Sequence, residues 1–168
     1  MNSLKVFNVM TMQFDEIKYT EETTKPSFKS GYHFHIDGSY EKESGVGSWG
    51  CVMINGSYII ESSGRVPQVN LGTTRNVGAE LYAVIQALEY CRINSITAAT
   101  IHYDYSGVEL WPTGVWKAKN SITRNYRDIV KNSGITITWV HDKDSSYHTT
   151  AHKLANNYRV GTTNLPTN

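Results

Sequence analysis

Three carboxylates stand at points of the chain where folding can bring acids together. Asp37 closes Tyr32–Ile36, a stretch in which apolar and aromatic residues alternate with histidines as in a β-strand. Glu80 lies in the first turn of an amphipathic helical pattern, and Asp104 follows a second strand-like stretch. Hard divalent cations prefer carboxylate ligands, and a buried carboxylate needs a partner of this kind. The three acids together therefore predict a divalent-cation site.

Each acid also has a plainer explanation when it is taken alone. Asp37 precedes Gly38-Ser39 and could cap a turn, and the helix dipole favours Glu80 near a helix start. The common position of the acids, at a strand end, a helix start and another strand end, favours convergence. Two cations about 4 Å apart would orient a water and stabilise the leaving oxygen of a phosphodiester. No glycine-rich phosphate loop, G-x-S-x-G elbow or Cys-His pair competes with this interpretation.

The surrounding patterns predict the elements that must hold these acids. Strands are expected at 32–36, 48–54 and 58–66, and Asn55-Gly56 predicts a hairpin between the last two. Helical spacing predicts a helix over 77–93 with Asn76 as its N-cap. Further elements are expected as strands at 97–103 and 135–141, one or two helices in 108–130 broken at 112–114, and a last helix at 148–159. The helical crossover makes the fourth strand parallel to the meander.

Composition bounds the class of protein. The chain has 168 residues, 39% of them hydrophobic, and a net charge of +1, which suits one globular domain and leaves a nucleic-acid partner open. No apolar run of about 18 residues and no secretory signal pattern are present, so a cytoplasmic location is expected. Cys51 and Cys91 are expected as buried free thiols rather than as a disulfide.

The two ends of the chain are expected to lie outside the main domain. Residues 1–30 form an extension in which alternating apolar residues predict one strand, followed by a polar linker. That strand would extend a sheet edge or meet a second subunit. The main domain is expected over 31–160, and 161–168 as a frayed tail.

A modest basic patch follows the fourth strand. Its residues are Lys117, Lys119, Arg124, Arg127 and Lys131, with Asp128 as the only acid among them. A binding surface and a solvated helix face explain this patch about equally well.

The three acidic motifs, in this order, resemble type 1 ribonucleases H over about residues 31–160. Asp37 in HIDGS matches the family's first catalytic aspartate, Glu80 in NVGAEL its helix glutamate, and Asp104 in IHYDYSG its third acid. A bacterial and phage branch related to viroplasmin-linked ribonucleases H is similar in the stretch 103–111 and in Gly114, Trp116, Lys117, Asn120 and Arg75-Asn76-Val77. The resemblance implies an α/β (α+β) fold, a five-stranded mixed sheet with three antiparallel strands and then two parallel ones, flanked by helices.

By the same resemblance, the protein is expected to cut the RNA strand of RNA–DNA hybrids with two Mg²⁺ or Mn²⁺ ions, leaving 5′-phosphate and 3′-hydroxyl ends. It is expected to act as a monomer with no protein partner. Residues expected to line the RNA strand are Gly38, Ser39, Asn76 and Ser106. Lys117 and Lys119, with Trp111 and Trp116, would hold the DNA phosphates, although two tryptophans near a helix break are more often core residues.

Two departures from the family pattern stand near the C-terminus. His152 occupies the place of the fourth catalytic aspartate in an N-x-x-x-D-x-L-A pattern, and we expect it to serve as a ligand that shifts the metal preference towards manganese. The family's Gly-His-x-Gly loop is also absent, and His141 or Asp144 could take part of its role in product release.

Three alternatives remain open from the sequence. One is a ribonuclease H fold that binds hybrid or double-stranded RNA without efficient cleavage, which the histidine at position 152 motivates. A second is a zinc site on His148 and His152, four residues apart, with His141 as third ligand. A 3′→5′ exonuclease ranks last because its acidic motifs are missing. His33, His35 and His102 are interpreted as packing or surface residues.

Overall fold

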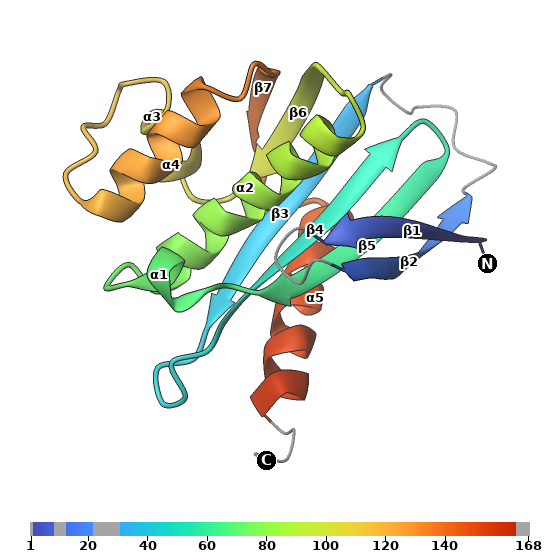
Figure 1. Ribbon diagram of the computed structural model, residues 1–168, viewed down its shortest axis with the longest axis horizontal. Coiled ribbons are helices and arrows are strands. Elements are labelled where there is room, and N and C mark those ends of the chain that lie inside the picture. The colour runs from blue at the N-terminus through green and yellow to red at the C-terminus, as the bar shows by residue number, and fades with distance from the viewer. Residues whose placement is uncertain (1, 9–12, 22–30, 164–168) are drawn as a thin grey trace.

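A mixed β-sheet with helices on both faces forms the centre of the protein (Figure 1). The computed structural model describes residues 2–8, 13–21 and 31–163. Its strands are β1 (Asn2–Asn8), β2 (Gln13–Glu21), β3 (Tyr32–Tyr40), β4 (Gly47–Asn55), β5 (Tyr58–Arg65), β6 (Ala98–Tyr103) and β7 (Thr136–His141). Their order across the sheet is β1-β2-β5-β4-β3-β6-β7.

The predicted five-stranded sheet is confirmed within this larger one. β3, β4 and β5 form an antiparallel meander, β6 is parallel to β3, and β7 is parallel to β6. The β4–β5 turn lies at Gly56, whose φ of 59° is the left-handed conformation that a tight hairpin requires. The Asn-Gly signal therefore located the turn correctly.

The N-terminal extension contains two strands, so the prediction of one strand is wrong. β1 and β2 pair antiparallel, and β2 pairs with the edge strand β5 through Tyr19↔Ile60, Thr20↔Ile59 and Glu21↔Tyr58. The extension therefore lengthens the sheet at its β5 edge. The polar stretch expected as a linker begins inside β2, because backbone pairing with β5 continues to Glu21, and its remaining residues, 22–27, lie outside the described part of the chain.

The helices are α1 (Gln68–Leu71), α2 (Asn76–Ile93), α3 (Gly107–Leu110), α4 (Ser121–Lys131) and α5 (Ser146–Thr163). Asn76 is the first helical residue of α2 and not its N-cap; that position belongs to Arg75, with φ 53°. α5 continues through Gly161 to Thr163, so the tail expected from 161 is helical there, while 164–168 lie outside the described residues. None of the described helices combines the length and apolar character needed to cross a membrane.

The two faces of the sheet are covered differently. α2 packs against β3 and β4 on one face, with α4 beside it, and α5 packs against β3, β4 and β5 on the other (Figure 1). The main apolar core lies on the α2 side and includes Phe34, Ile36, Leu81, Val84 and Ile101. A small cluster around Val52, Ile54 and Ala151 serves the α5 side. Cys51 and Cys91 are buried and free, as predicted.

Candidate active site

The register of β3 and β6 places Asp37 and Asp104 at the same end of the sheet. The parallel pairing of these strands runs to His35↔His102; Asp37 lies two residues further along β3, and Asp104 directly follows the last residue of β6. Because side chains alternate with a period of two, the aspartates share the face of His35 and His102, which is the face that α5 covers. Asp37 is 7% exposed, whereas the side chain of Asp104 is 43% exposed.

Asp37 does not end its strand, which corrects the sequence prediction. β3 continues to Tyr40 because β4 supplies pairing partners for the whole stretch, including Gly38↔Trp49 and Ser39↔Ser48. The Gly38-Ser39 pair is therefore extended backbone rather than a turn. Asp37 is held between two paired neighbours, which fixes its backbone more firmly than a loop would.

Glu80 reaches the site because α2 lies directly on the backbone of β3. A Cβ atom placed on Gly38 would be 2.4 Å from the Glu80 nitrogen, so glycine is what permits the approach. Glu80 is 8% exposed, and the Tyr105 N–H donates to its Oε1 at 3.1 Å. Since α2 starts at Asn76, Glu80 lies in the second helical turn and not in the first. The helix dipole therefore explains its identity less well than the site does.

The electrostatics of Glu80 favour a bound cation. Burial raises its pKa from 4.5 to about 8, and the charges of Asp37 and Asp104 act in the same direction, against backbone hydrogen bonds from Tyr105 and Asp104. A carboxyl in this position is costly to ionise unless positive charge is supplied. Three carboxylates around one sheet end, with oxygen donors suited to hard cations, fit divalent metal ions.

His152 lies at the site, as the sequence predicts, and it contacts Asp37. Its Nδ1 is 2.6 Å from Asp37 Oδ2, and its Nε2 is 3.1 Å from the amide nitrogen of Asn156. Ser39 in turn donates from its hydroxyl to Asn156 Oδ1 at 2.7 Å. One proton arrangement satisfies all three bonds: Ser39 donates to Asn156, Asn156 to His152 Nε2, and His152 Nδ1–H to Asp37. The residue that sequence reasoning missed in this chain is Asn156.

His148 was considered from the sequence only as a zinc ligand, yet it lies beside an acid of the site. Its Nε2 is 3.9 Å from Asp104 Oδ2, so α5 presents one histidine to each aspartate. His141 makes a third kind of contact, with its Nε2 2.6 Å from the Asp104 carbonyl oxygen. Within the described side chains, His141, His148 and His152 do not form a close group of metal donors. The structure therefore does not support a zinc site made of these three.

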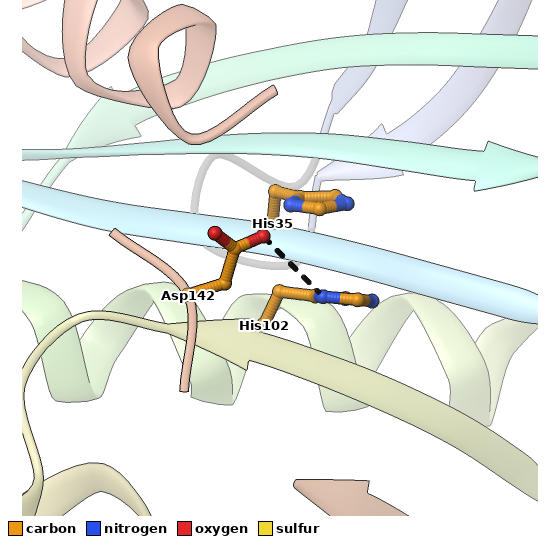
Figure 2. Close-up of side chains that lie close together, drawn as sticks. All are labelled: His35, His102 and Asp142. Atoms are coloured by element: carbon orange, nitrogen blue, oxygen red, sulfur yellow. Dashed lines mark ion pairs between the residues drawn. The ribbon is translucent and has the colours of Figure 1, made fainter. Parts of the chain in front are cut away.

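A different trio of donors forms a close group among the described side chains, and the acids Asp37, Glu80 and Asp104 do not form another by the same distance. Ligand atoms of His35, His102 and Asp142 all lie within 4.8 Å of one another (Figure 2). Both histidines and His33 are buried, so of the two interpretations made from the sequence, packing or surface, the surface one is wrong. Burial, followed by the charge of His102, lowers the pKa of His35 from 6.5 to about 3.

The comparison with protein-family models decides the family. The RNase H model matches residues 29–159, which include the three acids and His152. The chain belongs to the ribonuclease H family. Members of this family are nucleases that act on RNA–DNA hybrids and generally use divalent metal ions, so the chain is a ribonuclease H enzyme by family.

Solved structures show the same fold at low identity. RNase H1 from Halobacterium salinarum NRC-1 is 24% identical with a TM-score of 0.60, covering 76% of this chain and 96% of that chain. The N-terminal RNase H domain of Rv2228c from Mycobacterium tuberculosis is 20% identical with a TM-score of 0.61, covering 76% and 98%. LC11-RNase H1, obtained from compost by a metagenomic approach, was solved with an RNA/DNA hybrid; it is 20% identical with a TM-score of 0.66, covering 79% and 99%. No curated protein matches the chain.

The residues expected to line the substrate of this ribonuclease H lie on the elements that carry the acids or next to them. Gly38 and Ser39 adjoin Asp37 in β3, Ser106 precedes α3, and Asn76 begins α2 with an exposed side chain. Ser39 is 8% exposed and donates to Asn156, so its first role is to support the His152 network.

The basic patch lies on the segment between α3 and α4 and on α4 itself. Lys117 and Lys119 are exposed, beside Trp116, which is 39% exposed. Trp111 and Trp116 pack edge to face with ring centroids 5.7 Å apart, and both also contact the Tyr105 ring. Trp111 also packs against the main core, whereas Trp116 is exposed, so the core expectation holds in part for one of the two tryptophans. The helix break is longer than predicted, spanning 111–120.

Proposed function

We propose that the protein is an endonuclease that hydrolyses the RNA strand of RNA–DNA hybrids, leaving 5′-phosphate and 3′-hydroxyl ends. Asp37, Glu80, Asp104 and His152 would hold two divalent ions, which, when bound, activate a water and stabilise the leaving oxygen. The observation that carries the proposal is the convergence of three acids: Glu80 is 8% exposed and lies close enough to Asp37 and Asp104 for their charges to raise its pKa. A compensating cation would let all three carboxyls be ionised together.

The protein's own contribution is to orient the acids before the substrate arrives. The Tyr105 N–H fixes one oxygen of Glu80, and His152 Nδ1 fixes one oxygen of Asp37. Asn156 holds the His152 ring from the other side, which sets its tautomer. For His152 to act as a ligand through Nε2, the Asn156 amide must turn away. We propose that His152 stands at the position of the family's fourth acid and that manganese is preferred to magnesium for this reason.

Substrate choice would rest on the shape of the hybrid. Gly38, Ser39, Asn76 and Ser106 would meet an RNA strand near the acids, where contacts to 2′-hydroxyls distinguish RNA from DNA. Lys117 and Lys119 would hold the DNA phosphates. A related protein of the same fold, LC11-RNase H1, was solved with an RNA/DNA hybrid. On the likeness of the stretch 103–111, we further propose that the protein belongs to the viroplasmin-related branch. We also propose that it is a monomer and that it is located in the cytoplasm.

Cleavage of labelled duplexes tests the proposal. The RNA strand is labelled in an RNA–DNA hybrid and in a double-stranded RNA, and each is incubated with Mg²⁺ or Mn²⁺ and with an Asp37→Asn control. We expect cleavage of the hybrid alone, products with 5′-phosphates, and loss of cleavage in the control. Hybrid that is bound but uncut in both metals would overturn the proposal.

A second candidate function is binding of hybrid or double-stranded RNA without cleavage. The specific observation in its favour is the 2.6 Å contact of His152 with Asp37, which occupies a carboxylate oxygen with an imidazole nitrogen. Thermal unfolding with and without Mn²⁺ separates the two functions, because a ligand that binds the folded state raises the melting temperature. An unchanged melting temperature together with hybrid binding would favour the binding module.

A further inference from the structure

The α5 face of the sheet carries a second group of potential metal ligands, apart from the catalytic acids. The imidazole rings of His35 and His102 stack with centroids 4.0 Å apart and planes 14° from parallel. Figure 2 shows the Asp142 carboxylate beside both rings. Ligand atoms of the three residues lie within 4.8 Å of one another, and His35 and His102 are 5% and 8% exposed. Two buried imidazoles and a carboxylate form a nitrogen–oxygen donor set.

The Asp142 carboxylate is oriented for such a role by its own loop. The N–H groups of Asp144 and Ser145 both donate to its Oδ1, each at 3.1 Å. Oδ2 is the oxygen that lies towards His102 Nδ1, at 4.0 Å. One oxygen is therefore held by the backbone while the other is presented to the rings.

His102 is oriented from its far side. His33 Nδ1 lies 2.9 Å from His102 Nε2, and the two rings are in contact with centroids 5.2 Å apart. When His102 Nε2–H donates to His33, the lone pair of His102 is on Nδ1, the atom that faces Asp142. Histidines that bind metals usually have their second nitrogen held in this manner.

We propose that His35, His102 and Asp142 bind one transition-metal ion of the zinc class at a site separate from the catalytic ions. Zinc bonds of about 2.0–2.2 Å place tetrahedral ligand atoms about 3.4 Å apart, so the donors must approach by roughly 1 Å. Rotation of the His35 imidazole about χ2, a broad torsion, would supply this movement while His33 keeps the His102 ring in place. Imidazole ligands favour zinc, cobalt or copper over magnesium, which keeps the site distinct from the oxygen-rich site at Asp37, Glu80 and Asp104.

The place of the trio in the fold gives such an ion a structural role. His35 precedes Asp37 by two residues on β3. His102, which pairs with His35 in the β3–β6 register, precedes Asp104 by two residues. Asp142 lies in the loop that leads from β7 into α5, the helix that carries His148 and His152. One ion would thus tie together the two strands and the helix that position the catalytic side chains. This inference does not depend on hybrid cleavage.

Cobalt absorption tests the site with the metal alone. The full chain with Asp37→Asn and Asp104→Asn, which weakens the catalytic site, is titrated with Co²⁺, and visible d–d bands are recorded. We expect one Co²⁺ per chain, displaced by equimolar Zn²⁺ but not by millimolar Mg²⁺. Adding Asp142→Asn should lower the affinity by more than about tenfold, because losing a ligand costs more than losing the residue that orients it.

Matched variants separate this site from others. Asp142→Asn keeps the Oδ1 that accepts the loop N–H groups, so the loop should stay folded, and Asp144→Asn in the same loop should leave the bands unchanged. His102→Asn supplies a second ligand variant, with folding checked by circular dichroism. Absence of a one-to-one complex, bands that persist in both Asp142→Asn and His102→Asn, or bands lost instead in His152→Ala would overturn the proposal.

Discussion

The two faces of the central sheet use the same strands for different purposes. On β3, Phe34 and Ile36 point into the apolar core beneath α2, while His35, Asp37 and Ser39 alternate with them and face α5. The α2 face is almost wholly apolar, whereas the α5 face carries buried histidines, an aspartate and serines. Because the period of a strand is two, one strand can supply stability on one side and chemistry on the other.

The α5 face of the sheet holds its buried polar residues because α5 packs very close to the strands. A Cβ on Gly50 of β4 would lie 2.1 Å from the Ala151 carbonyl oxygen, and Ser48 donates from its hydroxyl to the Ala155 carbonyl at 2.6 Å. Close backbone contact and hydrogen bonds therefore stabilise the packing of α5, whereas buried apolar area stabilises the packing of α2. Losses on the α5 face should therefore appear mainly in function, and losses on the α2 face mainly in stability.

The largest difference between loss of cleavage and loss of stability should come from substituting an aspartate on the α5 face. Asp104→Asn keeps the shape of a side chain that is 43% exposed and removes its charge. We expect hybrid cleavage to fall by at least about 10³-fold, which exceeds the 10–100-fold typical of losing a residue that only orients a ligand. Unfolding in urea should hardly change. A drop in stability that matches the drop in cleavage would break the division between the faces.

Glu80 belongs to α2 but points to the site, and its titration should make the metal-free protein sensitive to alkali. The pKa of Glu80 in the folded state, about 8, lies above its ordinary 4.5. The stability linked to this group is thus full below pH 4.5 and is lost as pH rises through 8. At about 1.4 kcal/mol per unit, the loss is at most about 5 kcal/mol.

Urea unfolding of the chelator-treated protein at pH 5 and pH 8 measures this effect. Glu80→Gln should flatten the dependence and stabilise the metal-free protein at pH 8. Glu43→Gln, a change at an exposed glutamate, serves as the matched control. Parallel pH profiles for wild type and Glu80→Gln would contradict the account.

A core substitution on the α2 face should produce the opposite pattern from Asp104→Asn. Leu81 is 1% exposed and adjoins Glu80 in α2, and Leu81→Ala should lower the free energy of unfolding by about 2–5 kcal/mol. At a temperature where the variant is still folded, its cleavage rate should remain within a few-fold of wild type. The free energy of unfolding and the cleavage rate are measured on one preparation of Leu81→Ala. A loss of cleavage without a loss of stability would contradict the difference between the two faces.

A second pH effect concerns His35 and has the opposite sign from that of Glu80. The pKa of His35 in the folded state, about 3, lies below its ordinary 6.5, so its contribution is present above pH 6.5 and is lost as pH falls towards 3. Each pH unit in that window costs about 1.4 kcal/mol. His35→Phe, which cannot be protonated, should flatten the acid limb of a urea stability profile by about this slope. Identical acid limbs would show that His35 is not held neutral.

The sequence predicted the parts of this arrangement that depend on local patterns. Alternation and the Asn-Gly turn indicated the meander, and the acids at 37, 80 and 104 were recognised from their motifs. The second N-terminal strand was missed because the alternation of apolar residues shows no break in the sequence between Asn8, which ends β1, and Gln13, which begins β2. The extent of β3 past Asp37 was missed because it depends on pairing with β4.

The contacts of the histidines could not be predicted from local patterns, because they join residues far apart in sequence. Only the family resemblance put His152 in the same site as Asp37. His152 meets Asp37 across 115 positions, and His33 meets His102 across 69. A single sequence shows that a strand has histidines on one side, but only the β3–β6 register stacks His35 on His102. Nothing in the sequence marks Asn156 as a site residue except its position four residues after His152 on the same predicted helix.

The most direct test of the account compares RNA-strand cleavage in Mn²⁺ and in Mg²⁺ for wild type and His152→Asp. If the α5 face holds the catalytic site with His152 at its fourth position, the wild type cleaves hybrid faster in Mn²⁺. His152→Asp should then shift the ratio of the two rates towards Mg²⁺ by about tenfold or more. An unchanged ratio would contradict the place given to His152, and absence of cleavage by both proteins in both metals would contradict the catalytic site itself.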